Sequence, residues 1–185
     1  ETLDEAVADC AACDIYDPVL DTFTASAPML VPRMGHTATL LANGKVFVTG
    51  GLRALTVTPT QLSAVHDATN LTELYDPATN SWSAGPVLLT PSAGHLAMPR
   101  PDGKVLLAGG ISYDNVIIVG WLPTVRRTCD LYDPVANTMV AGPQMTRSRS
   151  LTDPVQIDSS RWLVAGGIAN LTLTNLGTPT NTAEI

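Results

Sequence analysis

The stretch TELYDPATNSWSAGP, residues 72–86, decides the fold, because two other parts of the chain have nearly the same sequence. They are CDIYDPVLDTFTASAP, residues 13–28, and CDLYDPVANTMVAGP, residues 129–143. The three Tyr-Asp-Pro triplets lie 59 and 57 residues apart, and three glycine pairs keep the same two intervals. Several landmarks that keep one period predict tandem structural units. We expect these landmarks to be structural: Gly50, Gly51, Tyr75, Asp76, Pro77, Trp82, Gly109, Gly110, Tyr132, Asp133, Pro134, Gly166 and Gly167.

Each unit is predicted to form four short strands. GHTATLL, residues 35–41, is the first, and the Asn43-Gly44 pair after it is a strong signal for a hairpin turn. The second strand, KVFVTGG at 45–51, is apolar on both sides of the pleat, so both faces of the sheet should be covered. The third ends at Tyr-Asp-Pro, where aspartate accepts backbone hydrogen bonds and proline presets φ. No segment shows sustained helical periodicity, so the chain is predicted to be all-β.

The repeating pattern resembles the kelch repeat, which forms one blade of a β-propeller. It has a glycine pair at the end of the second strand, a tyrosine in the third and, in one unit, Trp82 in the fourth. The sequences GHTATLL, NGKVFVTGG and ELYDPATNSW are similar to blades of galactose-oxidase-like and bacterial surface proteins. The resemblance implies an all-β, kelch-type β-propeller segment of about three four-stranded antiparallel blades. It implies one such segment over 1–185, with the end of one blade at 1–29, blades at 30–87 and 88–144, and a partial blade at 145–185. The last unit departs from the pattern, since SLTDPV stands where GHTATL is expected.

The predicted blades form an open arc of two, four, four and three strands. A bare sheet face of roughly 400 Å² would cost on the order of 10 kcal/mol at about 25 cal/mol per Å². That cost rivals the stability of a whole domain. We therefore expect the open faces to be covered by a protein partner or by the remaining blades of a longer chain.

Composition narrows the possible partners. The formal net charge is −7, with 17 acidic and 10 basic residues and no basic run, which argues against nucleic acid. The longest apolar stretch, Val116 to Pro123, is far shorter than the roughly 20 residues of a membrane span, so no membrane insertion is expected. Cys10 and Cys13 form a Cys-x-x-Cys pair, but without a second pair we interpret them as small half-buried residues.

Binding is expected on the long segments after the glycine pairs, residues 52–71, 111–128 and 168–182, because variable loops on a rigid scaffold usually carry function. The second segment combines apolar, aromatic and arginine residues, which are favoured at protein interfaces. The alternative is that its apolar run packs over the propeller or adds a strand. The candidate binding residues are Tyr113, Ile117, Trp121, Arg126, Arg127 and, in the first segment, His66.

A catalytic role is disfavoured, because the sequence has no nucleophile elbow, phosphate-binding loop or dinucleotide fingerprint. His36 and His95 are explained as repeat positions, so neither a metal site nor a cofactor is expected. Asn70 and Asn170 match the N-glycosylation pattern and are glycosylation candidates.

The sequence thus favours a non-catalytic binding or assembly module, extracellular or at the cell surface, that contacts a protein or a glycan. The first alternative is a segment of a galactose-oxidase-like oxidoreductase whose catalytic residues lie largely outside this segment. The second is an intracellular kelch adaptor, which would be cytoplasmic.

Overall fold

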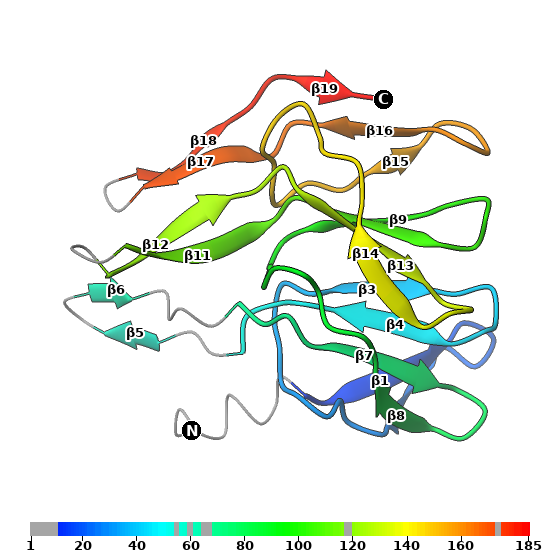
Figure 1. Ribbon diagram of the computed structural model, residues 1–185. Helices are drawn as coiled ribbons and strands as arrows, with labels where there is room; N and C mark the ends of the chain where they lie inside the picture. Colours follow the sequence, from blue (N-terminus) through cyan, green and yellow to red (C-terminus); the bar gives the residue numbers. More distant parts are fainter. Residues whose placement is uncertain (1–10, 54–55, 59–60, 64–67, 117–119, 173–174) are drawn as a thin grey trace.

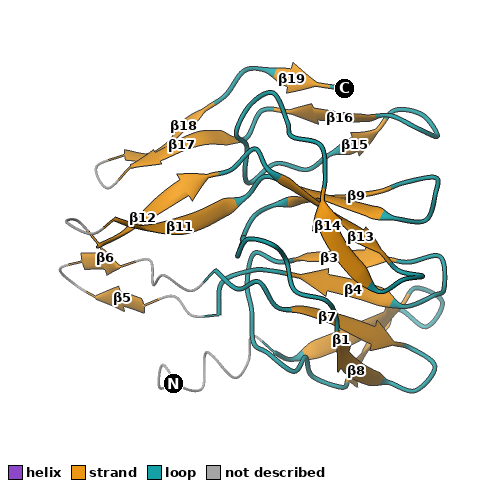
Figure 2. Cartoon of the chain, in the orientation of Figure 1, coloured by secondary structure: helices purple, strands orange, loops and turns teal. Residues whose placement is uncertain are grey.

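A computed structural model describes residues 11–53, 56–58, 61–63, 68–116, 120–172 and 175–185. These residues form antiparallel β-sheets joined by turns, and Figure 2 shows strands and loops throughout the described chain. Among them, no helix has the length and apolar character needed to cross a membrane. The all-β prediction is confirmed.

Two four-stranded sheets, which we call the first and the middle blade, form the centre of the molecule (Figure 1). A two-stranded sheet precedes them and a three-stranded sheet, the last blade, follows, so the predicted strand numbers are found. The first blade contains β3 (Thr37–Leu40), β4 (Val46–Thr49), β7 (Thr72–Asp76) and β8 (Ser81–Ala84). The middle blade contains β9 (Leu96–Pro99), β10 (Val105–Ala108), β13 (Cys129–Asp133) and β14 (Thr138–Ala141). The flanking sheets are β1 (Cys13–Asp17) with β2 (Thr22–Ser26), and β15 (Val155–Gln156), β16 (Trp162–Ala165) and β19 (Ala183–Glu184).

The three long segments after the glycine pairs are not plain loops, which corrects the sequence-based expectation. Each contains a β-hairpin, as the alternative of an added strand anticipated for the second segment. Figure 1 shows these hairpins on one side of the molecule and the tight turns of the blades on the other, and β12 packs against β17. We call this side the hairpin face. Its strands are β5 (Thr56–Thr58), β6 (Gln61–Ser63), β11 (Ile111–Val116), β12 (Gly120–Val125), β17 (Ile168–Thr172) and β18 (Asn175–Pro179).

The hydrophobic core lies between neighbouring blades, because strands such as β4 bury residues on both faces of the pleat. Phe47 of the first blade is fully buried and stacks on Tyr132 of the middle blade, with ring centroids 3.9 Å apart. A second cluster joins the middle blade to Val164 of the last blade. Each blade is therefore stabilised chiefly by its neighbours.

The Tyr-Asp-Pro triplet begins a turn built from side chains. The Asp76 carboxylate accepts a hydrogen bond from the Ala78 amide at 3.0 Å and pairs with Lys45 at 3.1 Å. Asn80 takes a left-handed conformation with φ 48°, and its side chain accepts a hydrogen bond from the Tyr75 hydroxyl at 3.0 Å. The other two turns repeat this arrangement, with Asp21 and Asn137 in the left-handed position.

The last blade differs where its sequence departs from the repeat. Leu151 occupies the position of Gly35 and Gly94 and keeps their left-handed conformation, with φ 53°. A leucine at positive φ is strained. The packing of the blade thus imposes this backbone conformation even where the residue does not favour it.

Candidate functional site

The hairpin face brings together some of the predicted binding residues. Tyr113 lies in β11 opposite Pro123 of β12, and its side chain is half-buried, which raises the pKa of its phenol. Arg126 and Arg127 follow β12 directly; Arg126 is half-buried and Arg127 is exposed. Trp121 is placed in β12 opposite Asn115, but its side chain is not described. Ile117 and His66 lie outside the described residues.

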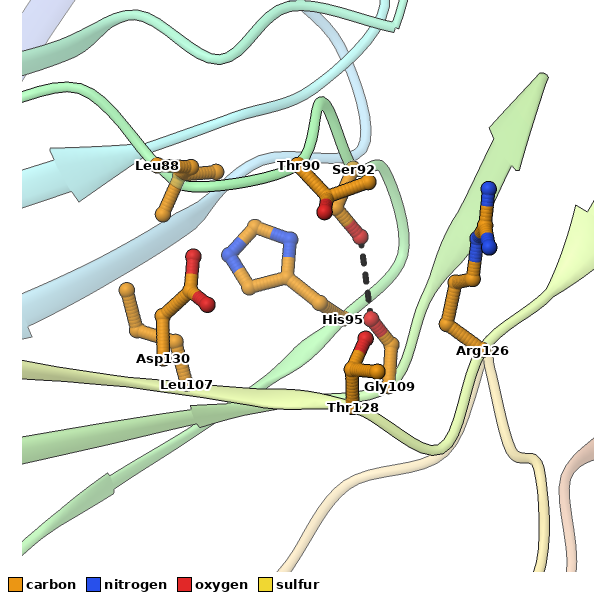
Figure 3. Close-up of a pocket in the computed structure, with 9 residues that line it drawn as sticks. All are labelled: Leu88, Thr90, Ser92, His95, Leu107, Gly109, Arg126, Thr128 and Asp130. Atoms are coloured by element: carbon orange, nitrogen blue, oxygen red, sulfur yellow. Dashed lines mark hydrogen bonds between the residues drawn. The ribbon is translucent and has the colours of Figure 1, made fainter. Parts of the chain in front are cut away.

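The backbone around the two arginines is fixed to the middle blade. The Arg126 amide donates to the Gly110 carbonyl at 2.8 Å, and the Arg127 carbonyl accepts from the Met145 amide at 2.9 Å. Figure 3 shows the Arg126 guanidinium directed away from Asp130. Arg127 is therefore an exposed residue on a backbone that is hydrogen-bonded to the middle blade.

Arg127 borders a polar hollow of about 530 Å³ between the middle and last blades. Arg147, which is also exposed, lines the same hollow together with residues that carry hydroxyl and amide groups. Neither arginine forms an ion pair with another residue in the described part of the chain. We call this site the arginine hollow; its lining is Arg127, Thr146, Arg147, Ser148, Ala169, Asn170, Thr180 and Thr182.

Glu184 holds two lining residues of the arginine hollow, Thr146 and Arg147, in place. Its carboxylate accepts hydrogen bonds from the backbone amides of Thr146 at 2.7 Å and Arg147 at 3.1 Å. Burial raises the pKa of Glu184, but the hydrogen bonds from Thr146, Arg149 and Arg147 outweigh it and hold that pKa below its usual range. The carboxylate therefore stays ionised and holds the loop that carries Arg147.

Sequence reasoning missed Arg147, because binding was expected on the long segments after the glycine pairs and Arg147 lies outside them. Only the stacking of the last blade on the middle blade brings Arg147 close to Arg127 and Asn170. The two glycosylation candidates differ in exposure, since Asn170 is exposed in β17 whereas Asn70 is half-buried and its carbonyl accepts from the Leu88 amide. A sugar on Asn170 would stand at the arginine hollow.

The two repeat histidines line a different hollow of about 470 Å³ beside β3 and β9, together with Asp153. The Nε2 atom of His95 lies 2.7 Å from the Thr49 hydroxyl and 3.0 Å from that of Thr37. Burial, with a smaller contribution from His36, lowers the pKa of His95 to about 4. The imidazole is thus neutral at pH 7 and held by hydroxyls. Across the described residues, no group of three or more His, Cys, Asp and Glu side chains is arranged to hold a metal ion.

Comparisons with known proteins give the same architecture. No family model matches the chain. The Kelch-like protein terF of Aspergillus terreus (strain NIH 2624 / FGSC A1156) is 30% identical over 102 residues, which cover 55% of this chain and 21% of that protein. The F-box/kelch-repeat protein SKIP4 of Arabidopsis thaliana is 28% identical over 104 residues, 56% of this chain and 26% of that protein. The solved structure of YjhT superposes with a TM-score of 0.72 at 14% identity, over 94% of this chain and 48% of YjhT.

The chain consists of kelch-type β-propeller blades. It spans about a fifth to a quarter of the length of the curated relatives it matches, and about half of YjhT. The likeness to YjhT at this identity concerns the fold alone. In these kelch blades the glycine pairs take left-handed conformations at the ends of β4, β10 and β16, where the chain leaves the blade for the hairpin face. A side chain at Gly50 would meet the Ser92 carbonyl at 2.2 Å, so the pair also allows two blades to approach closely.

Proposed function

We propose that these kelch blades form a non-catalytic protein-binding or assembly module, and that the partner presents carboxylate groups to the arginine hollow. The observation that carries this proposal is the pair of exposed arginines on one polar hollow of a chain whose net charge is −7. Arginine presents a rigid, planar fork of donors that matches a carboxylate, and it is enriched at protein interfaces. An acidic segment of a protein partner fits this chemistry.

A second contact surface is supported by the exposed apolar side chains of the two-stranded sheet. Phe23 of β2 is 74% exposed, and Ile15 and Tyr16 of β1 are about half exposed. A hollow of about 610 Å³ separates this sheet from the first blade and is lined partly by Met29 and Val48. Apolar surface of this kind is normally covered. We propose that the remaining blades of the intact protein, or a partner protein, cover it.

The arginine hollow is tested by direct binding measurements on the intact protein. Fluorescence anisotropy with Glu-rich and Asp-rich peptides should detect binding that the double substitution Arg127→Glu and Arg147→Glu weakens at least tenfold. Arg161→Glu is the matched control, because Arg161 is an exposed arginine that pairs with Asp158 outside the hollow. Equal binding by both variants, or binding of neutral oligosaccharides alone, would contradict an acidic protein partner and favour the glycan.

We propose an extracellular or cell-surface location, supported by the exposure of Asn170 in a matching N-x-Thr sequence. The intracellular adaptor is the second candidate, supported by the F-box/kelch-repeat name of one relative. Intact-mass analysis of the protein from its native host separates them. A sugar mass on Asn70 or Asn170 supports the extracellular proposal, whereas an unmodified mass together with recovery in the cytosol supports the adaptor.

A further inference from the structure

Two of the three blades contain a buried arginine that holds the blade together. In the first blade, the Arg33 side chain is fully buried and forms an ion pair with Glu73. Its Nη1 atom donates to the carbonyls of Gly50 at 2.8 Å and Leu71 at 2.9 Å. Glu73 in turn accepts from the backbone amides of Leu30 and Val31. We call this arrangement the arginine clamp.

The last blade repeats the clamp. Arg149 is fully buried, pairs with Glu184 at 3.1 Å, and donates from Nη1 to the carbonyls of Gly166 and Thr182, each at 2.8 Å. Glu184 accepts from two backbone amides, as Glu73 does. The arginine therefore satisfies one carboxylate and two carbonyl groups in each blade.

The middle blade has no arginine at this position. The repeat intervals place Ser92 where Arg33 and Arg149 stand. Strand pairing places Asp130 where the glutamates stand, since each acidic residue lies opposite the equivalent residue of the second strand of its blade. The Ser92 hydroxyl donates to the Gly109 carbonyl at 3.0 Å, and Asp130 accepts from the Leu89 amide at 2.9 Å, so part of the clamp survives. The Thr128 carbonyl keeps its bond from the Gly109 amide, but within the described part of the chain it receives no side-chain donor like the one its counterparts receive.

A small cavity of about 20 Å³ lies where the guanidinium is missing. Ser92, Gly109, Thr128 and Asp130 line it, and Figure 3 shows the His95 imidazole and the Asp130 carboxylate bordering the same space. His95 is 5% exposed, and its Nδ1 atom is buried with no hydrogen-bond partner among the described residues. A cavity needs only about 10–15 Å³ to hold one water, provided that the water finds two to four polar partners.

We propose that the middle blade binds one ordered water molecule in this cavity, and that the water takes over the bonds of the missing guanidinium. It donates to the Asp130 carboxylate and to the Thr128 carbonyl, the two acceptors that the arginine satisfies in the other blades. Its oxygen accepts from Nδ1–H of His95, since Nε2 then accepts from the threonine hydroxyls and the ring stays neutral. A dry cavity would leave the buried Nδ1 atom of His95 without a partner among the described residues.

Crystallography of the intact protein tests the site. We expect one density peak at about 2.7–3.2 Å from both an Asp130 oxygen and the Thr128 carbonyl oxygen. An empty cavity would overturn the proposal. Crystals grown with Rb⁺ in place of Na⁺ and K⁺ provide a second arm, because an anomalous signal at the peak would assign it to a cation and not to water.

Ser92→Arg restores the residue that the other blades carry. The guanidinium should displace the water, pair with Asp130 and raise the Tm by a few degrees. Ser92→Ala is the matched control, because it removes only the bond to the Gly109 carbonyl and should keep the water. A density peak that is lost in Ser92→Ala would contradict the assigned partners, and the wild-type crystal decides the question even if Ser92→Arg does not fold.

Discussion

At the scale of single residues, Asn80 does more than end a turn. Its Oδ1 atom accepts hydrogen bonds from Tyr75, from the Ser26 hydroxyl at 2.8 Å and from the Ala27 amide at 3.0 Å. The latter two belong to the preceding sheet and its exit, so the turn residue also joins neighbouring sheets. Its left-handed conformation is one that asparagine tolerates better than most residues.

Asn80→Ala is expected to lower the free energy of unfolding by about 2 kcal/mol, because it removes these bonds and strains the backbone. Asn80→Gly keeps the left-handed conformation and loses only the bonds, so its loss should be smaller. Urea denaturation of both variants measures the difference. Equal losses would show that the backbone conformation contributes nothing.

His95 should make stability depend on pH. Its pKa is about 4 in the folded protein, whereas an unfolded histidine titrates near 6.5. Because the unfolded chain binds this proton first, folding stability is full above about pH 6.5 and falls as the pH is lowered toward 4. The shift corresponds to a loss of roughly 3 kcal/mol.

The measurement is urea denaturation at several pH values between 7 and 4.5. His95→Gln should be less stable at pH 7 yet show a flatter profile, since the titrating group is gone. His36→Gln is the control for removing a histidine at the equivalent repeat position. Burial lowers the pKa of His36 as well, but its side chain is only partly buried, so this substitution should change the slope less than His95→Gln does. An unchanged slope in His95→Gln would assign the pH dependence to other groups.

At the scale of elements, the arginine clamp fixes the third strand of a blade to the segment that enters it. Glu73 is 2% exposed, so removing its partner leaves a buried charge without compensation. Arg33→Met should therefore cost about 3–5 kcal/mol. Arg33→Met combined with Glu73→Gln removes the charge as well and should recover part of that loss. Thermal and urea unfolding of the single and double variants give the coupling, and additive losses would contradict a clamp that acts as a unit.

The strands of the blades could be predicted because each carries its own local signal. Asn43-Gly44 sets a hairpin turn, Tyr-Asp-Pro sets the next, and the glycine pair ends the second strand. The hairpins β5–β6 and β17–β18 carry no comparable signal, and β11–β12 was predicted only as an alternative because its apolar run also suits packing over the propeller. The arginine hollow could not be predicted, since Arg127 and Arg147 meet only through the stacking of two blades.

At the scale of the whole molecule, the two-stranded sheet at one end presents apolar side chains that we propose are covered in the intact protein. Phe23→Cys in the intact protein should then react with maleimide at least tenfold more slowly than Val135→Cys. Val135, at 96% exposure on a turn, is the matched control. Peptide mapping by mass spectrometry separates these sites from the native cysteines. Equal labelling rates would mean that nothing covers this sheet.

The arginine clamp also has a consequence for synthesis. The Leu30 amide donates a hydrogen bond to the carboxylate of Glu73, which lies 43 residues later in the chain. At about 5–20 residues per second, roughly 2–9 s pass before the ribosome supplies the carboxylate that fastens this segment. We expect nascent chains stalled before Glu73 to be cut by protease near Leu30, and chains stalled well beyond it to resist; equal cleavage would refute this order. A blade with an arginine clamp would then be fixed to the segment that enters it only after its own third strand has been synthesised.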